Sequence, residues 1–143
     1  MIRLPEVSPV SPTAMDSDRA ADPQTTRSIL VIDDSDLMTR ALHALLARAG
    51  FVVSVCNTGL AALRIATEEK PDAAIIDIHL PDINGLVLTQ RLRDLLGPAA
   101  PLVILSGDTS LETLNSLPHV GATYFFPKPV RGAELVARLR EWL

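Results

Sequence analysis

Residues 73–85 read AAIIDIHLPDING, and this stretch decides the fold that we expect for the chain. It begins with a continuous apolar run, places one carboxylate, Asp77, directly after that run, and ends on Asn84 and Gly85. Continuous apolar runs are typical of strands covered on both faces, as in parallel sheets. A carboxylate beside such a strand is costly to bury without partners, although it can also cap the next turn. The stretch therefore predicts a buried parallel strand with Asp77 at its carboxyl end.

Four more apolar runs lie on either side of this stretch, and amphipathic segments of helical length separate them. The predicted strands cover residues 29–32, 51–55, 73–76, 102–105 and 122–126. The predicted helices cover residues 35–50, 58–70, 84–97, 110–117 and 131–142, with Ser35, Thr58 and Asn84 as N-terminal caps. Strands that alternate with crossover helices predict an α/β fold, namely a doubly wound five-stranded parallel sheet with five helices.

Polar residues stand where the predicted strands end. Asp33 and Asp34 follow the first strand, Asp77 the third, Ser106 the fourth and Lys128 the fifth. The carboxyl ends of parallel strands meet at one edge of the sheet, so these five groups are expected to converge. Carboxylates that lie close together repel one another, and hard oxygen ligands suit Mg²⁺. The pattern predicts a divalent-cation site at which an ammonium and a hydroxyl can hold phosphoryl oxygens.

Four motifs resemble the signatures of the receiver domains of two-component response regulators, which have the CheY-like, flavodoxin-like fold. They are VIDDS at residues 31–35, IDIHLPDING at 76–85, LSG at 105–107 and PKP at 127–129. Each motif is weak alone, but together they occur in the family's order and spacing. The resemblance covers residues 28–143 and predicts a receiver domain there.

The resemblance implies a role for each residue at the strand ends. Asp77 is implied to accept a phosphoryl group from a phosphohistidine. Asp34, Asp77 and the main-chain carbonyl of His79 are implied to bind Mg²⁺, for which Mn²⁺ can substitute, and Asp33 to support the ion through water. Such a protein assists its own phosphorylation and dephosphorylation but is not a turnover enzyme.

The resemblance also implies a switch at the other polar positions. Ser106 and Lys128 are implied to bind the phosphoryl group, and Phe125 to be the aromatic residue coupled to Ser106. Phenylalanine replaces the tyrosine that is common there, which removes a phenolic hydrogen bond but retains the packing signal. We hypothesise that His79 and Asp108, each two residues after a site residue, tune dephosphorylation, with His79 facing solvent in its loop.

Charge and apolar content exclude some classes of function and predict where the protein is located. A formal charge of -4 and a pI near 5.3 offer no basic face for direct nucleic-acid binding. The sequence has no apolar run long enough for membrane insertion and no secretory leader, so a soluble cytoplasmic protein is expected.

Cys56 lies in an apolar run and is expected to be a small buried hydrophobic residue. Residues 1–27 contain four prolines among small polar residues, and we expect a flexible N-terminal tail there.

The leading hypothesis is a stand-alone receiver in a phosphorelay. Its partners would be a sensor histidine kinase or histidine phosphotransfer protein and a downstream effector, which would bind the face made by the fourth predicted helix, fifth strand and fifth helix. A phosphorelay shuttle, a phosphorylation-dependent dimer and a receiver truncated from a longer regulator or hybrid kinase remain alternatives. A flavin binder is disfavoured because Asp33 and Asp34 would repel a flavin phosphate. An aspartyl-phosphate enzyme is disfavoured because His79 stands where such enzymes carry a second carboxylate.

Overall fold

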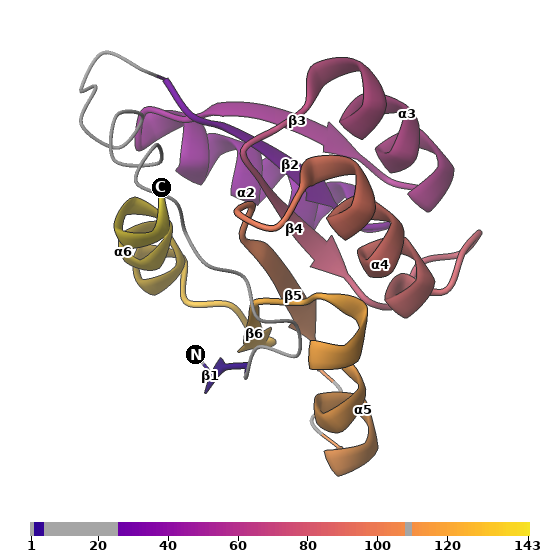
Figure 1. The fold of residues 1–143 in the computed structure, drawn as a ribbon. Coiled ribbons are helices and arrows are strands. Elements are labelled where there is room, and N and C mark those ends of the chain that lie inside the picture. Colours follow the sequence, from indigo (N-terminus) through magenta and orange to yellow (C-terminus); the bar gives the residue numbers. More distant parts are fainter. Residues whose placement is uncertain (1, 5–25, 108–109) are drawn as a thin grey trace.

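A computed structural model describes residues 2–4, 26–107 and 110–143, which form an α/β fold (Figure 1). The strands are β1 (Ile2–Arg3), β2 (Ser28–Ile32), β3 (Val52–Cys56), β4 (Ala73–Asp77), β5 (Leu102–Ser106) and β6 (Tyr124–Pro127). The helices are α2 (Asp36–Arg48), α3 (Gly59–Glu69), α4 (Gly85–Leu96), α5 (Leu111–Ser116) and α6 (Gly132–Trp142), with a short 3₁₀ helix, η1 (Pro118–Val120).

The sheet has the strand order β1-β6-β5-β4-β2-β3, and the five strands from β2 to β6 run parallel. The predicted doubly wound sheet with five helices is therefore confirmed. All residues of β4 and β5 are buried, as expected for strands covered on both faces. The last parallel strand begins at Tyr124 and not at residue 122, because the chain first turns through η1.

Helices cover both faces of the sheet. One apolar cluster includes Leu46 of α2 and Leu135 of α6, and the other includes Ala62 of α3 and Leu88 of α4. Figure 1 shows the same division, with α2 and α6 on one side of the strands and α3 and α4 on the other. This arrangement leaves the carboxyl ends of the parallel strands as the natural location of a binding site.

The predicted helix caps are present. The side chains of Ser35, Thr58 and Asn84 each accept a hydrogen bond from a backbone N–H in the first turn of the helix that follows, and Ser110 does the same for α5. These bonds satisfy amide groups that have no partner inside a helix. Among the described residues, no helix is both long and apolar enough to cross a membrane.

Strand β1 corrects one part of the predicted tail. Ile2 and Arg3 pair antiparallel with Phe125 and Tyr124 of β6, which makes a sixth strand that the sequence did not predict. The side chain of Leu4 is buried in the apolar cluster on the α3 and α4 side of the sheet. The physical reason is that β6 would otherwise present an unpaired edge, which any nearby extended segment can occupy. The remainder of the predicted tail up to residue 25 lies outside the described residues.

Cys56 behaves as the sequence predicted. It ends β3 with 8% of its surface exposed, and its thiol donates to the main-chain oxygen of Thr58 at 3.7 Å. Burial raises the pKa of the Cys56 thiol to about 11, and backbone hydrogen bonding at Thr58 offsets only part of this increase. The neutral thiol is therefore the form present at physiological pH, and it is a poor nucleophile.

We expect Cys56 to resist alkylation in the native protein. The pKa rises from 9.0 to about 11, so at pH 8 the thiolate is roughly a hundredfold scarcer than in an exposed cysteine, and burial slows the reaction further. Iodoacetamide labelling followed by mass spectrometry should be slow in buffer and complete in denaturant. Equal labelling rates under the two conditions would contradict the buried placement.

Candidate functional site

Three carboxylates meet at the carboxyl ends of the parallel strands. One carboxylate oxygen from each of Asp33, Asp34 and Asp77 lies within 4.8 Å of the others. Asp33 and Asp77 are 1% and 4% exposed, whereas Asp34 is open to solvent. The convergence that the sequence predicted from the strand ends is therefore present for these residues. Buried carboxylates this close together repel one another and need compensating charge.

Backbone and amide groups hold Asp33 in place. Its Oδ1 accepts a hydrogen bond from the Ser35 backbone N–H at 2.9 Å, so Ser35 both caps α2 and orients the carboxylate. Its main-chain N–H donates to the Cys56 oxygen at 3.2 Å, and its main-chain oxygen accepts from Asn57 Nδ2 at 2.9 Å. Asn57 was not predicted, because only the parallel pairing of β2 with β3 brings it beside Asp33.

Asp77 has a different partner at each oxygen. Its Oδ1 accepts from the backbone N–H of His79 at 3.1 Å, which is the short turn that a carboxylate after a strand favours. Its Oδ2 lies 3.3 Å from the Nζ of Lys128. Asp77 ends the strand at the position that the sequence predicted, and both the turn and the ion pair supply partners for its carboxylate.

Lys128 supplies the positive charge of the site. Its Nζ lies 3.3 Å from Asp33 Oδ2 as well as 3.3 Å from Asp77 Oδ2, so one ammonium bridges the two buried carboxylates. Burial alone would lower the pKa of this ammonium, but attraction to Asp33 and Asp77 outweighs burial and leaves its pKa above the ordinary lysine value. Lys128 therefore stays charged throughout the neutral range.

The backbone around Lys128 connects it to the neighbouring strand. The Lys128 N–H donates to the Ser106 main-chain oxygen at 3.0 Å, and the Lys128–Pro129 peptide bond is cis. Ser106 ends β5 and is 1% exposed, directly across from Pro127 in the sheet. Ser106 and Lys128 thus stand at the ends of adjacent strands, after the fourth and fifth parallel strands as the sequence predicted.

The loop between β4 and α4 forms one wall of the site. His79 and Asn84 form an isolated antiparallel bridge, which closes the loop on itself. A Cβ atom at Gly85 would collide with the backbone of Ile78, so only glycine fits where the loop enters α4. The His79 side chain is exposed, as predicted. The backbone of the loop is therefore fixed while its side chains remain accessible.

Asp82 links this loop to α3. Its Oδ1 and Oδ2 accept hydrogen bonds from the backbone N–H groups of Gly59 and Leu60, at 2.9 Å and 3.0 Å. These two bonds lower the pKa of the Asp82 carboxyl, so it remains ionised at the positive end of the helix. This contact carries no signal in the sequence, because the partners are far apart along the chain and an acidic residue in a loop is common.

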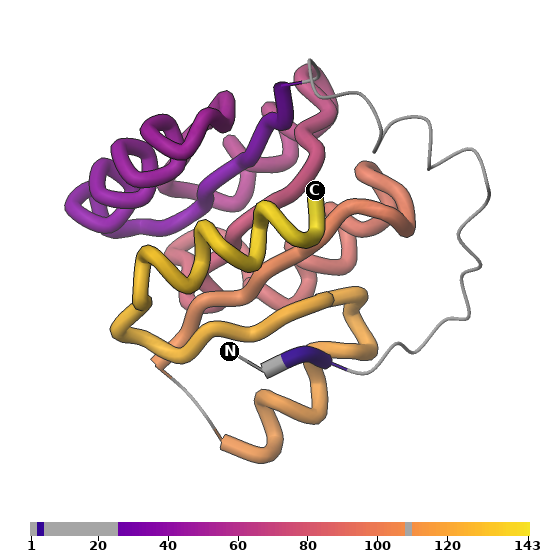
Figure 2. Tube along the Cα trace, turned by 90° about the vertical axis from the view of Figure 1, so that its left-hand side faces the viewer, coloured from indigo at the N-terminus to yellow at the C-terminus, as the bar shows by residue number. Residues whose placement is uncertain are grey.

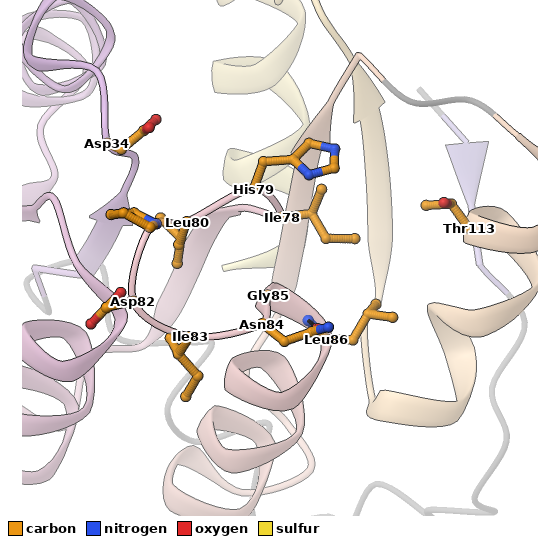
Figure 3. Close-up of a pocket in the computed structure, with 11 residues that line it drawn as sticks. Asp34, Ile78, His79, Leu80, Asp82, Ile83, Asn84, Gly85, Leu86 and Thr113 are labelled. Atoms are coloured by element: carbon orange, nitrogen blue, oxygen red, sulfur yellow. Dashed lines mark hydrogen bonds between the residues drawn. The ribbon is translucent and has the colours of Figure 1, made fainter.

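An open pocket of ≈ 630 Å³ adjoins the carboxylates. It is lined by Asp34, by residues 78–86 and by Thr113 of α5. Figure 3 shows the loop crossing the pocket between Asp34 on one side and Thr113 on the other, with the imidazole of His79 at its upper rim. A small group that reaches the acidic cluster therefore has room beside the loop.

The predicted switch residue, Phe125, lies within the sheet. Phe125 is fully buried in β6 and pairs with Ile104 of β5. It belongs to the apolar cluster on the α3 and α4 side of the sheet. Asp108 lies outside the described residues.

The donor set fits a divalent cation. The three carboxylates and the single ammonium leave two formal negative charges uncompensated in a partly buried site. All the side-chain donors of the cluster are hard oxygens, which suit Mg²⁺ or Mn²⁺ and not the softer metals that prefer thiolate or imidazole. The assignment of individual ligands, including the His79 carbonyl, remains a prediction.

The sequence of this chain is similar to the sequences of known regulatory proteins. The family model for the response regulator receiver domain matches residues 29–140. The transcriptional regulatory protein KdpE of Mycobacterium tuberculosis is 38% identical over 112 residues, covering 78% of this chain and 49% of KdpE. The sensory/regulatory protein RpfC of Xanthomonas campestris is 34% identical over 116 residues, covering 79% of this chain and 16% of RpfC. The chain thus spans about half the length of KdpE and less of RpfC.

Solved structures of receiver-type proteins have the same fold as this chain. The chemotaxis protein CheY4 of Vibrio cholerae superposes with a TM-score of 0.77 at 26% identity, covering 83% of this chain and 100% of that chain. A CheY-like receiver domain protein from Methanospirillum hungatei gives a TM-score of 0.77 at 26% identity, covering 82% and 93%.

Replacing Lys128 should destabilise the metal-free protein. We expect Lys128→Met to lower the free energy of unfolding at neutral pH by about 1–2 kcal/mol, because Asp33 and Asp77 lose their shared counter-charge in a partly exposed site. Folding raises the pKa of Lys128, so the contribution is complete below the ordinary lysine pKa and is lost as the pH rises through the raised value. Urea denaturation at several pH values measures both effects.

Arg138→Met is the matched control for this experiment. The Arg138–Glu141 pair lies on the surface of α6, and its loss should cost about 0.5 kcal/mol or less. If Lys128→Met cost no more than Arg138→Met in metal-free buffer, the ion pairs with Asp33 and Asp77 would not contribute as we argue.

Proposed function

This chain belongs to the response regulator receiver domain family, and on that premise we propose that Asp77 accepts a phosphoryl group from a phosphohistidine. The observation that carries the proposal is the bridging ammonium of Lys128, 3.3 Å from both Asp77 and Asp33, beside a cluster of three carboxylates. The donor would be a sensor histidine kinase or a histidine phosphotransfer protein. The protein would thereby take part in a phosphorelay.

The proposed transfer requires little of the protein beyond position and charge. One Asp77 oxygen forms a bond to phosphorus while the bond from phosphorus to the donor imidazole breaks, and the nitrogen retains the bonding pair and regains a proton. The backbone N–H of His79 holds Oδ1, so the carboxylate has a defined orientation before transfer. The pocket beside Asp34 offers room for the donor side chain.

Two side chains of the site can stabilise the negative charge on the oxygens of the transferred phosphoryl group. Lys128 stays protonated and can move from the carboxylates to a phosphoryl oxygen, and the Ser106 hydroxyl at the end of β5 can hold another. A bound Mg²⁺ would neutralise charge that develops on the phosphoryl oxygens. Asp34 and Asp77 would hold the ion directly together with the His79 carbonyl, and Asp33 would hold it through water; Mn²⁺ would substitute.

We further propose that phosphorylation is reported through Ser106 and Phe125. A shift of Ser106 toward the phosphate would alter the packing of Phe125, which is fully buried in the neighbouring strand. The predicted output face, stated in terms of the observed elements, consists of α5, β6 and α6. An effector that binds this face would detect the change. KdpE is a transcriptional regulator, and for this chain the identity of the effector is part of the proposal.

Alternatives within the family remain. A phosphorelay shuttle or a receiver that is part of a longer regulator would use the same chemistry at Asp77. In each case the protein is a phosphoacceptor that assists its own labelling and hydrolysis and does not turn over a separate substrate.

The central test is covalent labelling. With Mg²⁺ and acetyl phosphate, or with a phosphorylated histidine kinase, mass spectrometry should find one phosphoryl group on Asp77 in the wild type and none in Asp77→Asn. Asp94→Asn, an exposed substitution on α4, should label as the wild type does. Chelation of Mg²⁺ should abolish labelling. Absence of label on wild-type Asp77 with both donors would refute the proposal.

The lifetime of the phosphorylated form should depend on two residues that border the site. We propose that His79, exposed beside Asp77, and Asp108 influence how water approaches the phosphoryl group. Decay of the labelled protein should change in His79→Ala and in Asp108→Ala, whereas Asp94→Asn should decay as the wild type does. Unchanged lifetimes in both variants would exclude a tuning role and leave the labelling itself unaffected.

A further inference from the structure

The N-terminal strand β1 lies along the outer edge of β6. One end of the sheet has the strand order β5-β6-β1, so β1 is the described strand that covers the edge of β6 facing away from β5. Figures 1 and 2 show β1 beside β6, with α5 and α6 on opposite sides of that strand. The segment therefore lies in the middle of the proposed output face made by α5, β6 and α6.

The contacts of this segment are specific although few. Ile2 pairs with Phe125, and Arg3 pairs with Tyr124. The Leu4 N–H donates to the Thr123 main-chain oxygen at 3.1 Å. The Leu4 side chain is only 6% exposed and belongs to the same apolar cluster as Phe125. One strand thus contacts both the backbone of β6 and the cluster that contains the proposed switch residue.

The edge of β6 is suited to an added strand. An edge strand carries a row of N–H and C=O groups without partners, and an extended peptide can satisfy them while its alternate side chains fill pockets. Here the Leu4 side chain is buried in the apolar cluster, and the Arg3 side chain is exposed. This alternation of buried and exposed side chains is the pattern expected of a strand that docks on one face.

The attachment is short enough to be reversible. The pairing of β1 with β6 joins two residues, Ile2 and Arg3, and Leu4 adds a buried side chain next to them. The sequence continues with Pro5, which has no amide hydrogen to donate to a longer ladder. Ordering a short segment costs conformational entropy that offsets part of the gain from burying one leucine and pairing two residues. A competing strand of similar sequence could therefore replace it.

We propose that the outer edge of β6 is a strand-addition site for an extended peptide with an apolar residue at the position of Leu4, and that residues 2–4 occupy this site in cis. A partner that uses the edge must displace them, so the segment restrains output. The role in output rests on the proposed function of the α5, β6 and α6 face. The docking of residues 2–4 does not depend on phosphorylation of Asp77.

The docking can be measured in the full, unphosphorylated chain by NMR amide exchange. We expect the Leu4 amide to be protected in the wild type and to exchange about tenfold faster or more in Leu4→Asp, because the buried leucine is the main apolar contact of the segment. Arg3→Ala, whose side chain is exposed, is the matched control and should keep the protection. Unchanged resonances of β2 and β4 would verify that Leu4→Asp is folded.

Occupancy of the site can be tested in trans. A labelled peptide with the sequence of residues 1–6, MIRLPE, should bind full-length Leu4→Asp in fluorescence anisotropy and bind the wild type at least about tenfold more weakly, because the wild-type edge is occupied. The same peptide with aspartate in place of leucine should not bind either protein.

Three results would overturn the proposal. They are an unprotected Leu4 amide in the wild type, equal binding of MIRLPE to the two proteins, and no binding to a folded Leu4→Asp chain. None of these measurements involves phosphate or Mg²⁺, so a failure here leaves the labelling test on Asp77 unaffected. Failure of the labelling test, in turn, would leave the docked strand in place without a role in signalling.

Discussion

The electrostatics of the site are governed by the mutual repulsion of three carboxylates. Asp33, Asp34 and Asp77 lie within 4.8 Å of one another, and two of them are almost fully buried. Such a cluster costs free energy unless its charge is met, and in this protein Lys128 meets part of it by bridging Asp33 and Asp77. The uncompensated charge makes the site receptive to a divalent cation.

The surrounding chain holds the repelling groups in position. Ser35 and Asn57 fix the segment that carries Asp33, and the His79 N–H fixes Asp77. Gly85 allows the β4–α4 loop to pass close to its own backbone, and Asp82 ties that loop to α3. The acidic side chains are therefore oriented by a scaffold of hydrogen bonds, and this preorganisation is what phosphoryl transfer requires.

The same strands that carry the site also connect it to the edge of the sheet. Ser106 and Lys128 stand at the ends of neighbouring strands, and Phe125 lies three residues before the lysine in a fully buried position. Beyond Phe125 the only neighbour in the sheet among the described residues is β1. Under the two proposals above, a change at the acidic cluster and a strand at the edge would both act on β6. Two sites that bias one element can influence each other without direct contact.

The sequence by itself determined the five parallel strands, the caps at Ser35, Thr58 and Asn84, and the meeting of Asp33, Asp34 and Asp77. These features depend on apolar periodicity, on local capping chemistry and on the rule that parallel strands end at one edge, all of which can be seen in a linear chain. Only the tertiary structure decided that Asn57 holds Asp33, that Asp82 caps α3 and that Ile2 and Arg3 extend the sheet. Those contacts join segments far apart in the sequence, and a polar residue in a loop or two residues near a terminus carry no local signal. They form because strand pairing and helix packing first bring the partners within reach of unsatisfied backbone groups.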